Sequence, residues 1–318
     1  MDYINDIFAP LLQETGFSPD PTCEKYNPMG KTWKIEPELG EGHYWAYGHK
    51  DLFDIRIHDF SYNEDKIMEF NMPRCLNIAY YESVSGKELM PYRRLSAGCV
   101  KTFCGGEPYR IMMHKKIPIR SICIELLPRY YEGFIEERYP ELQFDIRNAF
   151  IQIGQTTDFP EMENLLMQVK NYMGTGIAAH LFFEGKVAEA LSLIANRERQ
   201  RFLKPSPSVT EHDMILIRNV TAYLDDHYAL EVPLEQLSKL ACMGTTKLKY
   251  TFRKYHGCTI TTYIQQRRIG HAEHLLLNSD LPIGQVSKAV GYSSSSRFSE
   301  LFRKSTGLLP REFRKLAK

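Results

Sequence analysis

The sequence predicts an α+β protein: an N-terminal β-barrel with helices, then an all-α C-terminal domain with two helix-turn-helix motifs. Two observations support this fold class. Apolar and polar residues alternate in much of 40–126, as in β-strands, whereas from about residue 158 apolar residues recur every three or four positions, as in helices. The last third of the chain also repeats one helical unit.

The strand-rich segment is clearest at Leu52–Phe60, with the sequence LFDIRIHDF. Phe53, Ile55 and Ile57 fall on one face of a strand, while Asp54, Arg56 and His58 fall on the other. Glycines and prolines separate this run from several similar ones. Many short strands joined by glycine turns are typical of a barrel or a sandwich.

A helix predicted near residues 179–203 carries an apolar stripe through Leu181, Ala188, Leu191 and Ile194. This stripe could pack on the barrel of its own chain or on a second copy. Because two-fold pairing is the commonest form of self-association, we expect a homodimer through this helix.

The segment LKPSPSV, Leu203–Val209, follows that helix. Its two prolines cannot continue a helix, so we place the domain boundary there. The prediction is a first domain at 1–203, a linker at 204–209 and a second domain at 210–318.

The charge of the chain is unevenly distributed. Residues 210–318 contain 16 basic and 10 acidic residues, a net charge of +6, and residues 1–209 have a net charge of −5. A basic domain beside an acidic one suggests that only the second meets a polyanion. No run of eighteen apolar residues occurs, so no membrane span is expected, and seven cysteines without a CxxC pair indicate reduced thiols in a cytoplasmic protein.

The repeated unit occupies Val232–Arg268 and Leu281–Lys315. Matched residues are 49 positions apart before Met243 and 50 apart after it. Each copy is predicted to form a short helix, a turn and a second helix with an apolar inner face, which is helix-turn-helix spacing. In the first copy Gly244 is expected to turn the chain, and the inner face is expected to contain Leu248, Phe252 and Tyr255.

The outer faces of the two second helices carry donors and acceptors near their N-termini and basic residues further along. Such groups can reach base edges in a major groove and neutralise phosphates. A merely solvated face is the alternative, but a repeated scaffold with different tips favours two readers of DNA. The intervening segment Thr259–Ser279 is predicted to be one helix of roughly 30 Å, close to the spacing of about 34 Å between successive major grooves.

Residues 210–318 resemble the DNA-binding domain of the AraC/XylS family of bacterial transcription regulators. The resemblance is strongest over Ile283–Arg314, through Gly291 and the aromatic residue after it, Phe298, Phe302 and the closing Phe-Arg pair. It implies seven helices, with base contacts from both second helices. The first reader would use Thr246, Lys247, Lys249 and Tyr250, and the second would use Ser295, Ser296, Arg297, Ser299 and Glu300. Arg253 and Arg303, further along the two helices, are the expected phosphate contacts.

Family members of this length combine such a domain with a cupin-like barrel that senses an effector and dimerises. The resemblance therefore implies a small-molecule effector, double-stranded DNA, RNA polymerase and a second copy as partners, and no enzymatic activity. The residues proposed to line the effector pocket are Trp45, Tyr47, His58, Tyr80 and Arg110, although aromatic residues at such spacing also occur in ordinary cores.

Two other interpretations remain open for the N-terminal domain. It could only dimerise, which would make the protein a constitutive regulator, or it could be a cupin-type enzyme fused to a DNA-binding domain. The histidines do not reproduce the cupin metal pattern, and no catalytic motif is present. The sequence therefore predicts no metal and no other cofactor.

Overall fold

The structure is a computed structural model that describes residues 4–71, 73–89, 92–139, 145–156, 158–203 and 209–317. The chain divides into two compact units, Met1–Arg201 and Phe202–Lys318. Most of the predicted linker, 204–209, lies outside the described residues.

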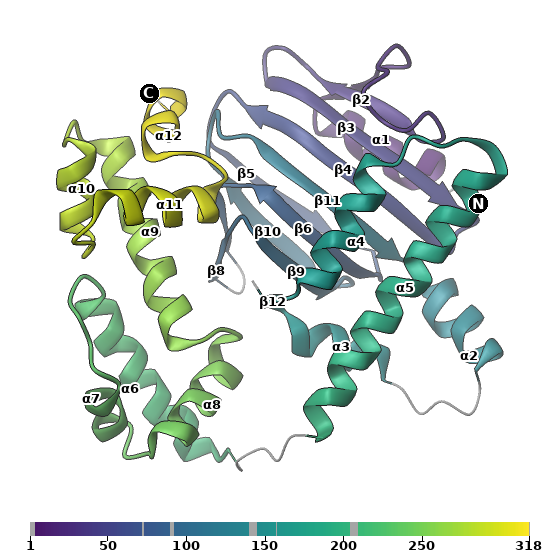
Figure 1. Ribbon diagram of the computed structural model, residues 1–318. Helices are drawn as coiled ribbons and strands as arrows, with labels where there is room; N and C mark the ends of the chain where they lie inside the picture. Colours follow the sequence, from purple (N-terminus) through teal and green to yellow (C-terminus); the bar gives the residue numbers. More distant parts are fainter. Residues whose placement is uncertain are drawn as a thin grey trace. The chain divides into compact units, whose positions relative to one another are not determined.

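The N-terminal unit contains an antiparallel eight-stranded sheet (Figure 1). Strand β4 (Phe53–Tyr62) pairs on one side with β3 (Gly40–His49) and on the other with β11 (Ile119–Leu126). In the pairing of β3 with β4, Trp45 lies opposite Ile57. In spatial order the strands are β1 (Phe17–Pro19), β2 (Lys31–Ile35), β3 (Gly40–His49), β4 (Phe53–Tyr62), β11 (Ile119–Leu126), β6 (Leu76–Ser83), β9 (Cys99–Cys104) and β12 (Gln155–Thr156).

A second sheet has four strands, in the order β5 (Lys66–Asn71), β10 (Pro108–Met113), β7 (Gly86–Leu89) and β8 (Tyr92–Leu95). Within the described residues, the eight-stranded sheet ends at β1 and β12 and is not closed. The predicted sheet-rich domain is therefore present, but the barrel is not confirmed. The difference lies in pairing across strand edges, which alternation along a single strand cannot predict.

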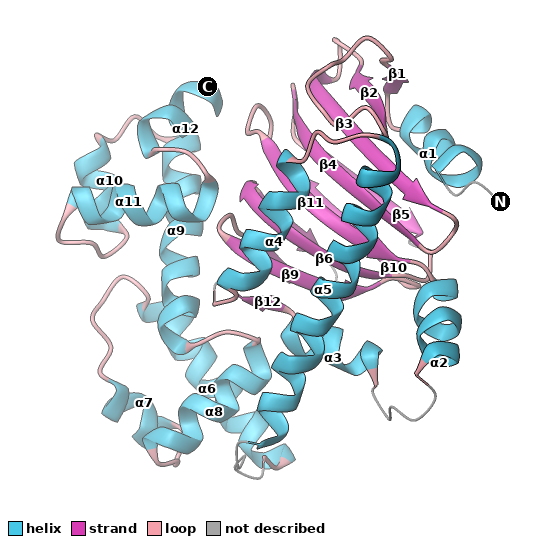
Figure 2. Ribbon diagram, turned by 45° about the vertical axis from the view of Figure 1, so that its right-hand side comes forward, coloured by secondary structure: helices cyan, strands magenta, loops and turns pink. Residues whose placement is uncertain are grey.

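Helices α4 and α5 cover one face of the large sheet and cross its strands (Figure 2). The core beneath them contains Trp45, Tyr47 and Ile124 from the strands and Leu165 and Phe183 from the helices. The helical elements are two π-helical turns, Ile4–Phe8 and Arg129–Phe134, and α1 (Ala9–Glu14), α2 (Ile135–Arg138), α3 (Ile146–Ile153), α4 (Pro160–Asn171) and α5 (Gly176–Leu203).

The predicted stripe on α5 does not lie on one exposed face. Leu191 and Ile194 are buried in the core of their own unit, whereas Leu181 is 63% exposed and Ala188 is also exposed. The helix buries Phe183 and Val187 together with Ile194, because at 100° per residue these three lie on the side of the helix opposite Leu181 and Ala188. Half of the stripe thus packs inside its own chain.

The polar face predicted for β4 is covered. Asp54 and Arg56 are buried and His58 is half-buried, and their neighbours on this face pack with apolar residues of the four-stranded sheet. Alternation along the strand separated two faces correctly, but it could not show that a second sheet covers the polar one.

The C-terminal unit is helical (Figure 1). It contains seven helices within the described residues: α6 (Glu211–His227), α7 (Leu234–Leu240), α8 (Thr245–His256), α9 (Ile260–Asn278), α10 (Ile283–Ala289), α11 (Ser295–Thr306) and α12 (Pro310–Ala317). The long helix α9 matches the predicted connecting helix, and Thr259 caps it by accepting a hydrogen bond from the Thr262 amide at 3.1 Å. Among the described residues, no helix is both long enough and apolar enough to cross a membrane.

We expect Phe183→Ala to lower the free energy of unfolding of the N-terminal unit by about 3–5 kcal/mol, because it leaves a cavity under α5. Leu181→Ala, on the exposed side of the same helix, should change it by less than about 0.5 kcal/mol. Both tryptophans of the chain, Trp33 and Trp45, are buried in this unit. Urea unfolding followed by tryptophan fluorescence therefore reports on this unit alone, and equal losses for the two variants would contradict the packing of α5.

Candidate nucleic-acid interface

The C-terminal unit contains two helix pairs of the same construction. Helices α7 and α10 have seven residues each, and α8 and α11 have twelve each. Each second helix ends at a glycine in the left-handed conformation, Gly257 with φ 70° and Gly307 with φ 81°. The duplication predicted from the sequence is therefore a duplication of structure.

In the first helix pair, the residue with the left-handed turn conformation is Cys242 and not the predicted Gly244. Gly244 has an ordinary φ of −64° and begins α8, while the left-handed residue of the first turn is Cys242, with φ 49°. Its counterpart in the second turn is Gly291, with φ 88°. A side chain at Gly291 would also meet the Ala229 carbonyl oxygen at 2.2 Å, so this turn requires glycine for space as well as for conformation.

Helix α8 is held by a buried side built on Leu248 and Phe252, both 0% exposed. Tyr255 was expected on this side but is 39% exposed, and its hydroxyl accepts a hydrogen bond from Arg218 Nε at 3.2 Å. Thr246, Lys249 and Arg253 are exposed on the outer side. Tyr250, on the same outer side, is half-buried.

Lys247 does not extend freely from α8. Its Nζ lies 2.9 Å from Asp213 Oδ1, on the first turn of α6. Asp213 Oδ2 also accepts a hydrogen bond from the Thr210 amide at 2.9 Å, and Thr210 Oγ1 accepts one from the Asp213 amide. The two hydrogen bonds form a capping box. The backbone hydrogen bond from Thr210, followed by that from Lys247, lowers the pKa of Asp213 to about 2. Lys247 is thus tied to α6, which a helical projection of α8 alone could not show.

Helix α11, the second predicted reader, is capped by Ser294, whose hydroxyl accepts a hydrogen bond from the Arg297 amide. Its buried side contains Phe298 and Phe302. On its outer side Ser295, Ser296 and Arg303 are exposed, and Ser299 is half-buried.

Arg297 and Glu300 form an ion pair on the outer side of α11. Arg297 Nη1 donates to Glu300 Oε2 at 2.8 Å, and their side chains are 60% and 67% exposed. An exposed pair of this kind adds little to stability. The guanidinium lies on the surface, where a planar group with fixed donors can meet a base edge.

One arginine of α9 joins the two helix pairs. Arg268 donates from Nε to the Tyr228 carbonyl at 2.7 Å, from Nη2 to Leu230 at 3.0 Å and from Nη1 to Gly291 at 2.8 Å. The first two carbonyls lie between α6 and α7, and the third lies in the turn between α10 and α11. A single guanidinium therefore connects the first pair to the turn of the second.

The length of α9 agrees with two binding surfaces on one DNA face. Its nineteen residues, Ile260–Asn278, span about 28 Å. Successive major grooves lie about 34 Å apart, so the helix is a spacer of suitable length.

Comparison with known proteins gives the same assignment. Residues 237–316 match the family model of a helix-turn-helix domain. Over 143 residues, which are 43% of this chain and 49% of its relative, the chain is 32% identical to the HTH-type transcriptional activator RhaR of Escherichia coli. The C-terminal unit is a helix-turn-helix domain of the AraC type. The AraC-type unit is also similar to part of the bifunctional transcriptional activator/DNA repair enzyme AdaA of Bacillus subtilis, at 32% identity over 31% of this chain and 47% of AdaA.

Among solved structures, the C-terminal domain of AraT, a response regulator from Geobacillus stearothermophilus, aligns with 31% of this chain and 84% of that domain. The two are 25% identical, with a TM-score of 0.31. The chain spans about half the length of the curated relatives it matches.

The structure does not bring the five predicted effector-binding residues together. Trp45, Tyr47 and Tyr80 lie in the core between the large sheet and its helices. Trp45 Nε1 donates to the Asn27 carbonyl at 2.8 Å, and the Tyr47 hydroxyl lies 2.7 Å from His180 Nδ1. Arg110 has a 48% exposed side chain on the four-stranded sheet.

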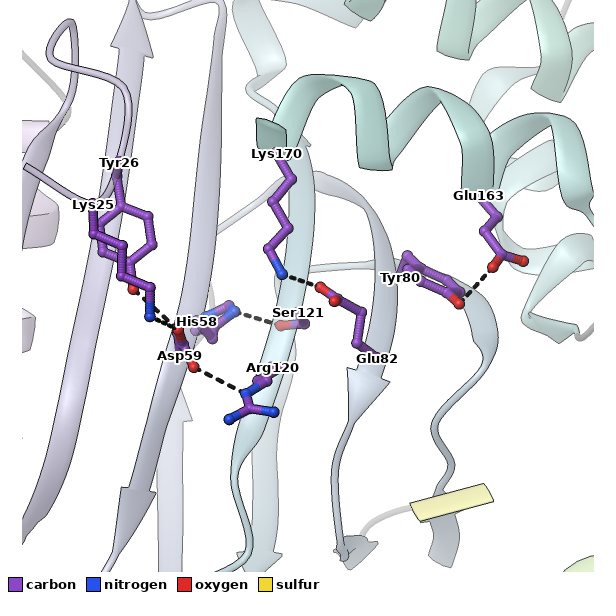
Figure 3. A network of polar contacts seen from close by, with 10 residues as sticks. All are labelled: Lys25, Tyr26, His58, Asp59, Tyr80, Glu82, Arg120, Ser121, Glu163 and Lys170. Carbon is purple, nitrogen blue, oxygen red and sulfur yellow. Dashed lines mark hydrogen bonds and ion pairs between the residues drawn. The ribbon is translucent and has the colours of Figure 1, made fainter. Parts of the chain in front are cut away.

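His58 and Tyr80 make separate contacts, which Figure 3 shows. His58 Nδ1 lies 2.7 Å from Ser121 Oγ, whereas the Tyr80 hydroxyl donates to Glu163 Oε1 on α4 at 2.6 Å. Burial lowers the pKa of His58 to about 3, so this histidine is neutral at physiological pH. Lys170 of α4 also donates to Glu82 of β6. This contact and the hydrogen bond from Tyr80 to Glu163 attach α4 to β6.

Sequence reasoning missed the buried charges between the two sheets. Lys101 of β9 pairs with Glu88 of β7, and the Tyr109 hydroxyl donates to Glu88 at 2.7 Å. Arg56 pairs with Asp54 at 2.7 Å and with Glu125 at 2.5 Å. Burial lowers the pKa of Lys101 to about 7 and, despite Arg56, raises that of Asp54 to about 7. The sequence signal that could have indicated these buried charges was a charged residue, such as Lys101, within an otherwise apolar strand.

We expect Arg268→Ala to destabilise the AraC-type unit by about 2–4 kcal/mol, because three backbone carbonyls lose a charged donor. Arg311→Ala, which changes an exposed arginine of the same unit, is the control. Urea unfolding followed by far-ultraviolet circular dichroism should show an earlier helical transition, while tryptophan fluorescence stays unchanged. A loss no larger than that of Arg311→Ala would contradict the linking role of Arg268.

Proposed function

We propose that the protein is a sequence-specific DNA-binding transcription regulator whose helices α8 and α11 enter successive major grooves of one duplex. The duplicated helix pair carries this proposal. Both second helices bury a phenylalanine at 0% exposure, Phe252 and Phe302, and expose an Arg-Lys pair one residue later. The scaffold is thus kept in both copies, while the exposed residues nearer the N-termini differ.

The contacts described above change the role that we propose for Lys247. Arg297 remains the base-reading residue that we favour most, because it is exposed and its guanidinium lies beside Glu300. Lys247 is a positioning residue that attaches α8 to α6 through Asp213, and Thr246 and Lys249 face outward beside it. Arg253 and Arg303, near the ends of their helices, are the phosphate contacts.

Arg297→Ala should reduce affinity for a duplex selected from a random library by about 1–3 kcal/mol and relax base preference within one half-site. Arg303→Ala should weaken selected and random duplexes alike and lower the salt slope by about one. Binding is measured with the full chain by fluorescence anisotropy over a salt series.

Lys34→Ala is the control for these variants, because Lys34 is exposed in the N-terminal unit. It should leave affinity and salt slope unchanged. Equal effects of Arg297→Ala and Arg303→Ala on specific and random DNA would contradict the division between base and phosphate contacts.

The N-terminal unit is proposed to dimerise through the exposed side of α5. Ile177 is 74% exposed and Leu181 is 63% exposed, one helical turn apart, and the exposed Ala188 continues this side. A two-fold axis would place the same residues of a second chain against them. Joining two DNA-binding units raises their effective concentration on paired sites without any new DNA contact.

We expect Leu181→Lys to convert a dimer into a folded monomer in sedimentation velocity at roughly tens of micromolar. Ile151→Lys is the matched control, because Ile151 is 61% exposed on α3 of the same unit. Unfolding followed by tryptophan fluorescence should be the same for both variants. A wild-type chain that sediments as a monomer, or a Leu181→Lys chain that remains a dimer, would exclude this interface.

The N-terminal unit is also proposed to sense a small molecule. The layer between its sheets supports this, because it contains the charged groups Arg56, Glu88 and Lys101 in an otherwise apolar interior. Such polar groups in an apolar layer can orient a polar ligand. RhaR and AdaA are both described as transcriptional activators, which favours activation and a contact with RNA polymerase.

A further inference from the structure

Three side chains of the N-terminal unit converge outside the layer between the sheets. Asp20 and Cys23 lie in the loop after β1, and His43 lies on β3. Their donor atoms all lie within 4.8 Å of one another, and this is the group of three such residues found among the described residues. His43 Nε2 is 3.2 Å from Asp20 Oδ2.

The loop arranges Asp20 and Cys23 as a pair. The Cys23 amide donates to the Asp20 carbonyl at 3.5 Å, which closes a turn of four residues. Asp20 Oδ1 accepts hydrogen bonds from the Thr22 amide at 3.2 Å and the Thr22 hydroxyl at 2.7 Å. One carboxylate oxygen is thus used to build the turn, and the other faces His43.

The surroundings keep the three side chains ordered and reachable. The side chains of His43 and Asp20 are 25% and 19% exposed, and Cys23 is half-buried. The Tyr26 ring packs edge-on against His43, with 6.3 Å between ring centroids. Lys25, which follows in the loop, forms an ion pair with Asp59, and the carboxylate of Asp59 offsets the charge of the lysine (Figure 3).

We propose that Asp20, Cys23 and His43 bind a divalent transition-metal ion of the zinc class. A thiolate, an imidazole and a carboxylate are the donors that Zn²⁺ prefers, whereas Mg²⁺ and Ca²⁺ prefer oxygen donors alone. Three protein ligands leave the fourth tetrahedral position to water. The hydrogen bond from the Thr22 hydroxyl contributes most to lowering the pKa of Asp20, so this ligand is a carboxylate at neutral pH.

The site lies on a loop that also supports α5. Asn27, four residues after Cys23, accepts a hydrogen bond from Trp45 Nε1 of β3 at 2.8 Å. Its side-chain amide donates to the carbonyls of Tyr172 and Gly174 at 2.9 and 3.0 Å, directly before α5 begins. A metal ion that fastens Asp20 and Cys23 to β3 therefore stiffens the segment that holds the start of α5.

The test is a titration of the full, untagged chain with Co²⁺, after chelation and under reducing conditions. One equivalent should produce a thiolate-to-cobalt charge-transfer band, and Zn²⁺ should displace the cobalt and remove the band. Cys23→Ser should abolish the band, and His43→Gln should weaken binding by more than about tenfold. Cys104→Ser, which changes another half-buried cysteine of the same unit, should have no effect.

Asp20→Asn tests the third ligand without breaking the turn, because an amide oxygen can still accept both hydrogen bonds from Thr22. It should weaken cobalt binding and leave urea unfolding of the metal-free chain unchanged. Absence of a thiolate band, or a band that persists in Cys23→Ser, would overturn the proposal. Because the readout is metal binding, its failure leaves the proposed DNA binding untouched, and a failure of DNA binding leaves the metal site untouched.

Discussion

The geometry of the AraC-type unit depends on one guanidinium. Arg268 donates hydrogen bonds to three backbone carbonyls, two in the segment between α6 and α7 and one in the turn between α10 and α11. A planar group with donors in fixed directions can meet all three from a single side chain. The turn at Gly291 can lie against Ala229 only because it lacks a side chain there. The relative positions of α8 and α11 follow from these two residues and from the rigid helix α9.

The N-terminal unit buries charged groups, and the stability of the fold alone gives little reason for this burial. Removing charges from water costs free energy, and replacing a buried ion pair with apolar residues is often neutral or stabilising. Arg56 and Lys101 nevertheless occupy the layer between the sheets. Arg56 is paired with Glu125 of the neighbouring strand β11, and Lys101 is paired with Glu88 of the four-stranded sheet. The proposed sensing role would give such groups a use, since a ligand can compete for their hydrogen bonds.

The sequence predicted the C-terminal unit far better than the N-terminal one, for a physical reason. Helix faces and caps depend on residues three or four apart, so Phe252, Gly257 and the bounds of α9 could be predicted locally. The ion pair of Lys247 was not predicted because its partner Asp213 lies on another helix. The covered face of β4 was not predicted because its cover comes from another sheet. The convergence of Asp20, Cys23 and His43 depends on a turn and on a strand twenty residues later, a spacing that matches no known ligand motif.

The ends of the large sheet have a consequence for colloidal behaviour. Its terminal strands are β1, with three residues including Pro19, and β12, with two residues. An unpaired strand edge is a template for the addition of further chains, and natural sheets protect themselves with edges that are short or interrupted by proline. Among the described residues, the two ends of the large sheet are thus short strands that disfavour the addition of further chains.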